Sequence, residues 1–577
     1  MMPRVPSAVA EGLLFTLIAF GPLAFGCVEP WSRATLEILA FTLALACFLR
    51  GPRPVPPAAS WFWLFPAGLA AFGLLQCLHP ASADLPRPAG PFTAAENATS
   101  SAALLWGAYA ALLWSVPQVI TTHRAARRFA RLLLGLGAAL AAQGVLQAAT
   151  GGGSLYWLRP TQLTGTFASY YNRDHAANFL LMALGMGLGV FMSKQRGWPE
   201  VDGPPAERVR EFAGLGALVA AIFAGVLATG SRGALLAMPL AAMLVGFAGA
   251  GFAADARARR LRAIAFLASA ALVVFFCFRV VSVAAEGGAQ TDRSITMRFF
   301  MYRDALPWLA DSPLFGTGLG SFETVYPSYQ DTSLGGLALH AHSDWLELAL
   351  ETGLFGLLAG LAAAILLAAV SVRSWLAAGS SEMRALIGGA LGAAAAFAIH
   401  ALFDFPFHIP GNAAVFLGII GFLLSAPQWA DKAAPTVRTA PAASWPSAAA
   451  AACAMLLSVA AARSGAETEP QRLQRRAAST YAAAVGGDAP APGALRSALA
   501  LSLEAAALRP FDFRVLELAG RVLTRLGRPA DAYEYSERSR LVRFTPLVVG
   551  EGRDRDEAER RKTETLKSMG LLPRGFR

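Results

Sequence analysis

The chain has 577 residues, of which 55% are hydrophobic and 15% charged, and its mean hydropathy is +0.47. Soluble domains are about 45–50% apolar and about 25% charged, so this composition excludes an ordinary soluble protein and predicts that most of the chain lies in lipid. The net charge of +11 does not indicate nucleic-acid binding, because the arginines cluster in short loops between apolar runs.

The apolar runs predict thirteen transmembrane helices, each able to cross a hydrocarbon core about 30 Å thick. They lie near residues 9–26, 34–49, 61–78, 102–120, 130–148, 176–193, 212–229, 233–250, 262–280, 346–371, 383–402, 411–426 and 447–462. No convincing cleavage site follows the first run, so we expect a retained span and not a signal peptide. The five cysteines lie in or beside these runs without CxxC spacing, which predicts neither a disulfide framework nor a zinc site.

Loops rich in lysine and arginine alternate along the chain with loops that are poor in them, as the positive-inside rule requires. We assign the basic loops and the N-terminus to the cytoplasm. The opposite loops lie near residues 80–100, 149–175, 229–232, 281–345 and 403–410. Everything after residue 463 falls on that same outer side.

The predicted fold class is therefore all-α, a polytopic transmembrane helix bundle with a large outer loop and a soluble helical tail. Helices one to nine occupy residues 1–280, the large loop residues 281–345, helices ten to thirteen residues 346–462, and the tail residues 463–577. Five aromatic residues predict that the large loop is partly ordered. They are Trp308, Phe315, Phe322, Tyr326 and Tyr329.

The tail contains a weak internal repeat. Ala498 and Ala532, and also Ser502 and Ser536, are 34 residues apart, which is the tetratricopeptide period. The repeat covers about one and a half units, too few for independent stability, so we expect the tail to dock on the membrane domain or on a protein partner. The alternative is a generic helical hairpin.

The most informative motif runs from residue 340 to 356 and reads HAHSDWLELALETGLFG. His342 and Ser343 are followed after nine residues by Gly353 and after two more by Gly356. This is the H-[NSQ]-x9-G-x2-[GTY] pattern of O-antigen ligases, and on it the chain resembles the O-antigen ligase and O-antigen polymerase superfamily. The resemblance implies a catalytic role for His342, which Glu347 would tune. By itself, a histidine at a helix start is as often a cap or an interfacial residue.

Two arginines lie apart from the cytoplasmic clusters, Arg232 and Arg298. They resemble the superfamily's paired arginines, which are thought to hold the diphosphate of a lipid-linked donor, and Arg303 competes for that role. A guanidinium stays charged at any working pH and matches phosphate oxygens with a planar fork. The alternatives are an interfacial Arg232 and a salt bridge from Arg298 to Asp304.

Two further outer segments resemble the superfamily more loosely. Residues 165–180 contribute Asn172 and His175, although Asp174 departs from the family pattern there, and a second segment follows at residues 400–416. Its candidates are His400, Asp404, His408 and Asn412. These residues are predicted to bind or support the acceptor, or else to form polar turns that cap helix ends.

The glycine-rich segment at residues 312–330 also resembles the superfamily. Gly316, Gly318 and Gly320 permit a tight backbone whose exposed amides could bind an anion, although a GxGxG pattern alone is weak evidence.

Together these residues predict a metal-independent, inverting glycosyl transfer that needs no cofactor, on the periplasmic face of a bacterial inner membrane. The expected partners are a polyprenyl-diphosphate-linked glycan, a lipid, glycan or protein acceptor, membrane lipids, and a protein bound through the tail. The rival hypothesis is a transporter or flippase for a polysaccharide precursor. A third is a scaffold for glycan export.

Overall fold

The computed structural model describes residues 5–80, 90–151, 154–160, 165–196, 205–239, 293–326, 329–330, 338–430, 455, 458, 469–485, 491–508, 513–533 and 535. The α-helices are α1 (Ser7–Leu23), α2 (Pro30–Leu49), α3 (Pro57–Phe62), α4 (Leu64–Cys77), α5 (Glu96–Val119), α6 (His123–Ala149), α7 (Arg173–Arg196), α8 (Pro205–Thr229), α11 (Arg293–Asp311), α12 (Phe322–Val325), α13 (Asp344–Ala377), α14 (Ser381–His400), α15 (Pro410–Ala430), α17 (Glu469–Val485), α18 (Pro492–Leu508) and α19 (Phe513–Arg525). Two 3-10 turns are η1 (Phe25–Cys27) and η4 (Pro406–His408), and β1 (Ser154–Leu155) pairs antiparallel with β2 (Arg159–Pro160).

Nine of the described helices are long and apolar enough to cross a membrane, with α3 and α4 counted as one. Together with α1, which is apolar but only 17 residues long, they coincide with ten of the thirteen predicted spans. The predicted spans near residues 233–250, 262–280 and 447–462 lie largely or wholly outside the described residues. The chain is thus an all-α, polytopic membrane protein, as the composition predicts.

Small residues allow α7 and α14 to approach closely at the centre of the bundle. A Cβ at Gly185 would lie 2.6 Å from the backbone nitrogen of Ala393, and one at Gly189 would lie 2.9 Å from the Cα of Gly389. Helices in lipid associate through such close contacts, because lipid provides no hydrophobic force between them. The two contacts run in opposite directions along the helices, so the start of α7 and the end of α14 meet at the same end of the bundle.

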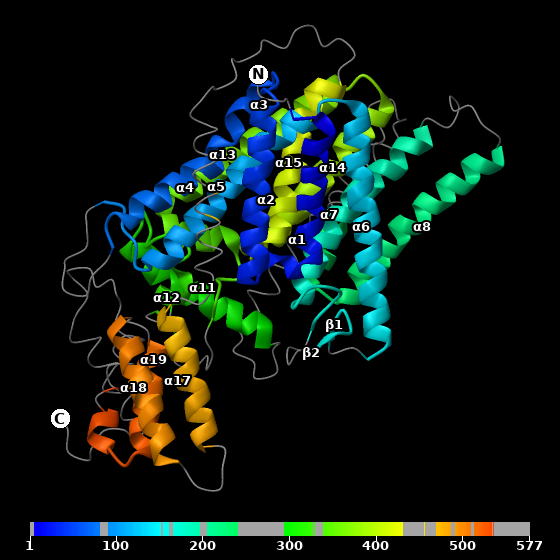
Figure 1. Cartoon of the computed structure of the whole chain (residues 1–577). Helices are drawn as coiled ribbons and strands as arrows, with labels where there is room; N and C mark the ends of the chain where they lie inside the picture. Colours follow the sequence, from blue (N-terminus) through cyan, green and yellow to red (C-terminus); the bar gives the residue numbers. More distant parts are fainter. Residues whose placement is uncertain are drawn as a thin grey trace.

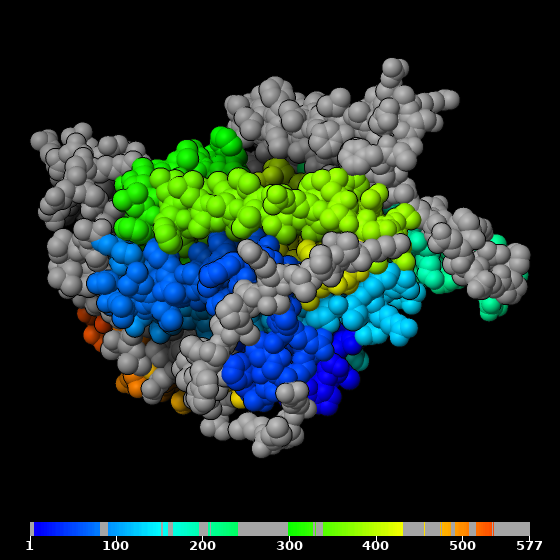
Figure 2. All heavy atoms as spheres, turned by 90° about the horizontal axis from the view of Figure 1, so that it is seen from above, coloured from blue at the N-terminus to red at the C-terminus, as the bar shows by residue number. Residues whose placement is uncertain are grey.

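The exterior of the bundle is apolar, as a lipid-facing surface must be. Along α13 the exposed large side chains are Leu354, Phe355, Leu358, Leu361, Ile365 and Leu366. Seen from above, the yellow-green segment that includes α13 lies along the blue segment that includes α4 and α5 (Figure 2). A helix in water would not leave a continuous apolar face of this size uncovered.

The large loop at residues 281–345 forms helices where it is described. Figure 1 shows α11, α12, the β1–β2 hairpin and the tail helices at one end of the bundle, away from the N-terminal end of α1. Four of the five predicted aromatic residues build a small core, in which Trp308 stacks on Tyr329 with ring centroids 5.8 Å apart and Phe322 stacks on Tyr326 at 4.9 Å. The fifth, Phe315, packs near Phe72 instead. This core fixes α11 and α12 beside the start of α13.

The described tail helices α17, α18 and α19 pack on one another. Ala498 and Ala532, which the 34-residue spacing relates, are both buried in the same small apolar core of the tail. The packing agrees with a helical hairpin or a tetratricopeptide unit alike, so the tetratricopeptide assignment stays a prediction.

Candidate active site

The buried carboxylate of Asp404 lies at the centre of a group of histidines from three different segments. Its oxygens are 3.6 Å from Nδ1 of His342, 3.8 Å from Nδ1 of His400 and 3.9 Å from Nε2 of His175. His175 begins α7 and His400 ends α14, so the close packing of these helices brings the two imidazoles together. Asp404 follows in the turn between α14 and η4.

The polar atoms of this group are buried without direct hydrogen bonds. Both oxygens of Asp404, both ring nitrogens of His400 and one ring nitrogen each of His175 and His342 have no hydrogen-bond partner among the residues that the structure describes. Unsatisfied buried groups are rare and demand an explanation, such as a bound substrate or water. Burial alone would raise the pKa of Asp404, but the neighbouring imidazoles outweigh it and hold that pKa well below its usual range.

His342 is held at the entrance to α13 in a strained conformation. Its φ is +49°, in the left-handed region that non-glycine residues seldom adopt, and Ser343 caps the helix by accepting a hydrogen bond from the Leu346 amide. The Asp344 amide donates to the carbonyl oxygens of Ala401 and Asp404, at 3.0 and 3.2 Å. These bonds tie the start of α13 to the turn that carries Asp404. The His342 side chain keeps 33% of its surface exposed, so it is the imidazole of the group best placed to reach a substrate.

A second polar network also borders the Phe405 ring, on which His340 stacks at 4.4 Å and which His342 meets edge-on at 5.0 Å. His340 Nδ1 is 2.9 Å and His408 Nε2 is 3.1 Å from the same oxygen of Glu347, and His408 Nδ1 is 2.9 Å from Asp344. Burial alone would lower the pKa of His408, but Glu347 and Asp344 outweigh it and raise that pKa to about 10. His408 is therefore an imidazolium at neutral pH and pairs with both carboxylates.

This second network is also where the described residues could best hold a metal ion. His340, Glu347 and His408 offer three ligand atoms that lie within 4.8 Å of one another. The same atoms already pair with one another as ions and hydrogen-bond partners. The carboxylate beside His342 is Asp404; Glu347, the predicted tuning residue, instead faces His340 and His408.

Two of the predicted arginines, Arg232 and Arg298, lie on segments that reach the first group. Arg232 is exposed at the start of the helical stretch 232–239 that follows α8, and a Cβ on the next residue, Gly233, would lie only 3.2 Å from Nε2 of His400. Arg298 lies on α11, one helical turn before Tyr302, whose hydroxyl donates to the His342 carbonyl at 2.9 Å. The segments that carry Arg232 and Arg298 therefore both border the histidine group.

The charges of Arg298 and Asp404 both affect the pKa of the Tyr302 phenol. Burial raises the pKa of Tyr302 to about 12, with the charge of Arg298 opposing this rise and that of Asp404 adding to it. Arg298 and Asp404 thus both act on the residue that holds the His342 backbone.

Arg303 is placed differently from the other two arginines. Two of its nitrogens lie 3.1 and 2.9 Å from one oxygen of Asp304, and its guanidinium lies 4.7 Å from the centroid of the Phe300 ring. The salt bridge that the sequence offered as an alternative for Arg298 is thus made to Asp304 by Arg303.

Two asparagines form hydrogen bonds that hold the segments around the site together. Asn172 accepts a hydrogen bond from the Asp174 amide at 2.8 Å, as a residue that caps a helix does. Asn412 accepts from the Tyr170 hydroxyl and donates to the His175 carbonyl and to Asn178. It therefore fixes the start of α7 against α15.

The glycine-rich segment has a structural role, because its amides are already used. The Gly320 and Phe322 amides donate to the Glu351 carboxylate at 2.8 and 3.0 Å, the Gly318 amide to the Glu351 carbonyl, and the Leu319 amide to Gln76. These contacts leave no row of exposed amides at these described positions, so the suggested anion-binding role is not supported.

Gly353 of the motif shows why a glycine is needed there. Its φ is +66° and ψ −163°, a conformation essentially restricted to glycine, and a Cβ would lie 2.3 Å from the backbone of Leu314. The chain entering the glycine-rich segment thus packs directly on a break in α13.

The sequence did not single out Tyr302, His340, Asp344 and Phe405. Two signals were present: Tyr302 is four residues after Arg298, hence on the same helical face, and His340 is two residues before His342. The partners of Asp344 and Phe405 lie far away in sequence and left no local pattern.

The comparisons with known proteins agree with the motif. Residues 217–361 match the family model described as O-Antigen ligase, which confirms the predicted resemblance. The match covers about a quarter of the chain and includes Arg232, Arg298 and His342, whereas His175 and Asp404 lie outside it. No curated protein matches the chain.

Proposed function

From the match of residues 217–361 to the O-Antigen ligase family, we propose that this chain is a membrane glycosyltransferase. It transfers a glycan from a polyprenyl-diphosphate donor to a lipid, glycan or protein acceptor at the periplasmic face of a bacterial inner membrane. The observation that carries the proposal is the convergence of the segments of Arg232, Arg298 and His342 on Asp404 at one end of the bundle.

Arg232 and Arg298 hold the donor diphosphate in this proposal, with Arg303 as a further contact. Guanidinium groups form bidentate, charge-assisted hydrogen bonds to phosphate oxygens and remain charged throughout the reaction. They neutralise the charge that develops on the leaving diphosphate, which makes transfer metal-independent.

His342 is the general base for the acceptor hydroxyl. The acceptor oxygen attacks the anomeric carbon and loses its proton to His342, while the bond from that carbon to the diphosphate oxygen breaks and the polyprenyl diphosphate leaves with the electron pair. A single displacement of this kind inverts the anomeric configuration. Asp404 stabilises the imidazolium that forms, and His175 and His400 hold Asp404 in place.

The remaining assignments follow the arginine distribution. The N-terminus is cytoplasmic, and the loop at residues 281–345 and the tail at residues 463–577 are periplasmic. In addition, the tail recruits a protein partner. Glu347, His340 and His408 shape the acceptor side next to His342.

The test is the fate of the lipid-linked glycan in cells that carry variants of the full chain. His342→Ala and Arg298→Ala should abolish transfer and leave the unmodified donor facing outward, whereas the control His123→Ala, at the other end of the bundle, should transfer normally. Donor that accumulates facing inward would indicate a flippase. Normal glycan attachment by both site variants would refute the proposed site, and a complete loss on deleting residues 463–577 alone would favour a scaffold.

A further inference from the structure

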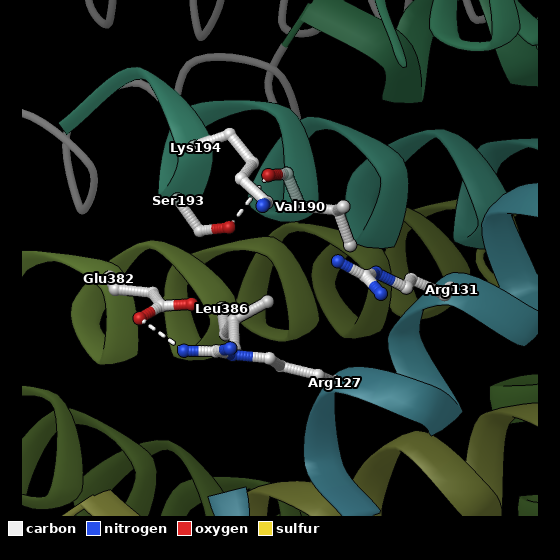
Figure 3. Close-up of a pocket in the computed structure, with 7 residues that line it drawn as sticks. All are labelled: Arg127, Arg131, Val190, Ser193, Lys194, Glu382 and Leu386. Carbon is white, nitrogen blue, oxygen red and sulfur yellow. Dashed lines mark hydrogen bonds and ion pairs between the residues drawn. The ribbon is translucent and has the colours of Figure 1, made fainter. Parts of the chain in front are cut away.

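A basic pocket lies between α6, α7 and α14, at the end of these helices opposite the histidine group. Its lining residues are Arg127, Arg131, Val190, Ser193, Lys194, Glu382 and Leu386. Figure 3 shows the two arginines reaching in from α6, Lys194 and Ser193 coming from α7, and Glu382 and Leu386 coming from α14. Three cationic side chains therefore converge on a pocket lined by a single carboxylate.

The position of the pocket is fixed by the helices themselves. Nineteen residues of α7 separate His175 from Lys194, which corresponds to roughly 28 Å at about 1.5 Å per residue. The hydrocarbon core of a bilayer is about 30 Å thick, so the two sites lie at opposite membrane boundaries. The basic loops predict that the boundary with the pocket is the cytoplasmic one.

The positive charge of the pocket is only partly neutralised. Arg127 pairs with Glu382 at 2.7 Å, and Lys194 pairs at 2.8 Å with Glu211, which is half exposed. Arg131 is exposed and has no ion pair to any residue within the described ranges. The charge of Arg131 is therefore available to a ligand in the pocket, which Lys194 also lines.

Two helices also present their N-terminal ends at this boundary. Thr122 caps α6 and Ser380 caps α14, and both helices start within one or two turns of the pocket. The partial positive charge of a helix N-terminus adds to the field of the arginines and favours an anion. Val190 and Leu386 also line the pocket, next to the cations.

We propose that this pocket binds the phosphate of an anionic phospholipid. The convergence of cations from two helices at the membrane boundary suits a phosphodiester whose acyl chains stay in the bilayer. A free phosphate ion would offer the same charge but has no acyl chains that keep it in the bilayer beside the pocket. This site is independent of the proposed transferase chemistry.

The experiment uses the full chain, delipidated in detergent and titrated by native mass spectrometry with phosphatidylglycerol, with phosphatidylcholine of the same acyl chains, and with inorganic phosphate. We expect one phosphatidylglycerol to bind at least tenfold more tightly than phosphatidylcholine. Each basic side chain near an anionic headgroup contributes about fivefold, so Arg131→Gln with Lys194→Gln should weaken binding about 30-fold. Arg131→Gln alone should weaken it about fivefold, which preserves the test if the double variant does not fold.

The matched control is Arg124→Gln, which removes the same charge from an exposed position of α6 outside the pocket. It should leave phosphatidylglycerol binding within twofold of the parent chain. Equal binding by the parent and the Arg131 variants, or equal affinity for the two lipids, would overturn the proposal. Displacement of phosphatidylglycerol by an equal concentration of inorganic phosphate would assign the pocket to a free anion and overturn the lipid assignment.

Discussion

Asp404→Asn tests the proposed mechanism directly, because it removes one charge and keeps the shape of the side chain. Asp404 lies 3.6 Å from His342, which becomes an imidazolium when it accepts the proton of the acceptor. At an effective permittivity of about 20, a carboxylate at this distance stabilises that charge by about 4.6 kcal/mol. The His342 side chain is one-third exposed, so solvent screening reduces this to about 2–3 kcal/mol. We therefore expect kcat to fall about 30- to 150-fold, with an upper limit of about 2000-fold.

The assay is the initial rate of glycan transfer from purified lipid-linked donor by the detergent-solubilised or reconstituted protein. Asp344→Asn is the matched comparison, since that carboxylate is also buried but pairs with His408. It should reduce the rate much less. Thermal melting of each variant shows that it remains folded. If Asp404→Asn keeps more than half of the parent rate, Asp404 does not stabilise a charged His342 and the proposed base is wrong.

Four further predictions concern donor binding, metal dependence, packing and pH. Arg298→Ala should weaken donor binding about 10- to 100-fold, because a charge-assisted hydrogen bond is lost. Arg303→Ala should weaken it less, because Arg303 is already paired with Asp304. Equal effects of the two substitutions in a binding titration would contradict this. Transfer should proceed at an unchanged rate after dialysis against EDTA, and recovery only on adding a divalent ion would disprove metal independence. Gly353→Ala should lower the melting temperature, because the φ of +66° and the contact with Leu314 exclude a Cβ. The control is Gly214→Ala, since nothing lies within 4 Å of a Cβ at that position. Equal melting temperatures of the two variants would contradict the prediction. Folding raises the pKa of His408 from 6.5 to about 10, so the stabilisation by its imidazolium is complete below pH 6.5 and is lost as the pH rises toward 10. His408→Ala should therefore lower the melting temperature more at pH 6 than at pH 10.5. Equal losses at the two pH values would show that the imidazolium pairs are not stabilising.

The sequence by itself determined the membrane class and most of the helices. Apolar runs long enough to span lipid are local features, and the cost of an unpaired backbone in hydrocarbon forces them into helices whatever their neighbours are. The motif around His342 and Gly353 was likewise readable, because its spacing lies within one segment. The partial order of the loop at residues 281–345 was also predictable, because aromatic side chains such as Trp308 and Phe322 are stabilised when they pack together away from water.

Only the tertiary structure decided which charges meet. The sequence offered Glu347 as the partner of His342 because the two are neighbours on one helix, but the close packing of α7 on α14 and the turn after His400 place Asp404 there instead. In the same way, the sequence suggested that the amides of the glycine-rich segment are free to bind an anion, but the Glu351 carboxylate accepts hydrogen bonds from two of them. The basic pocket also needed three helix ends to come together. Contacts between segments separated by tens to hundreds of residues depend on how the helices pack, and no local pattern records them.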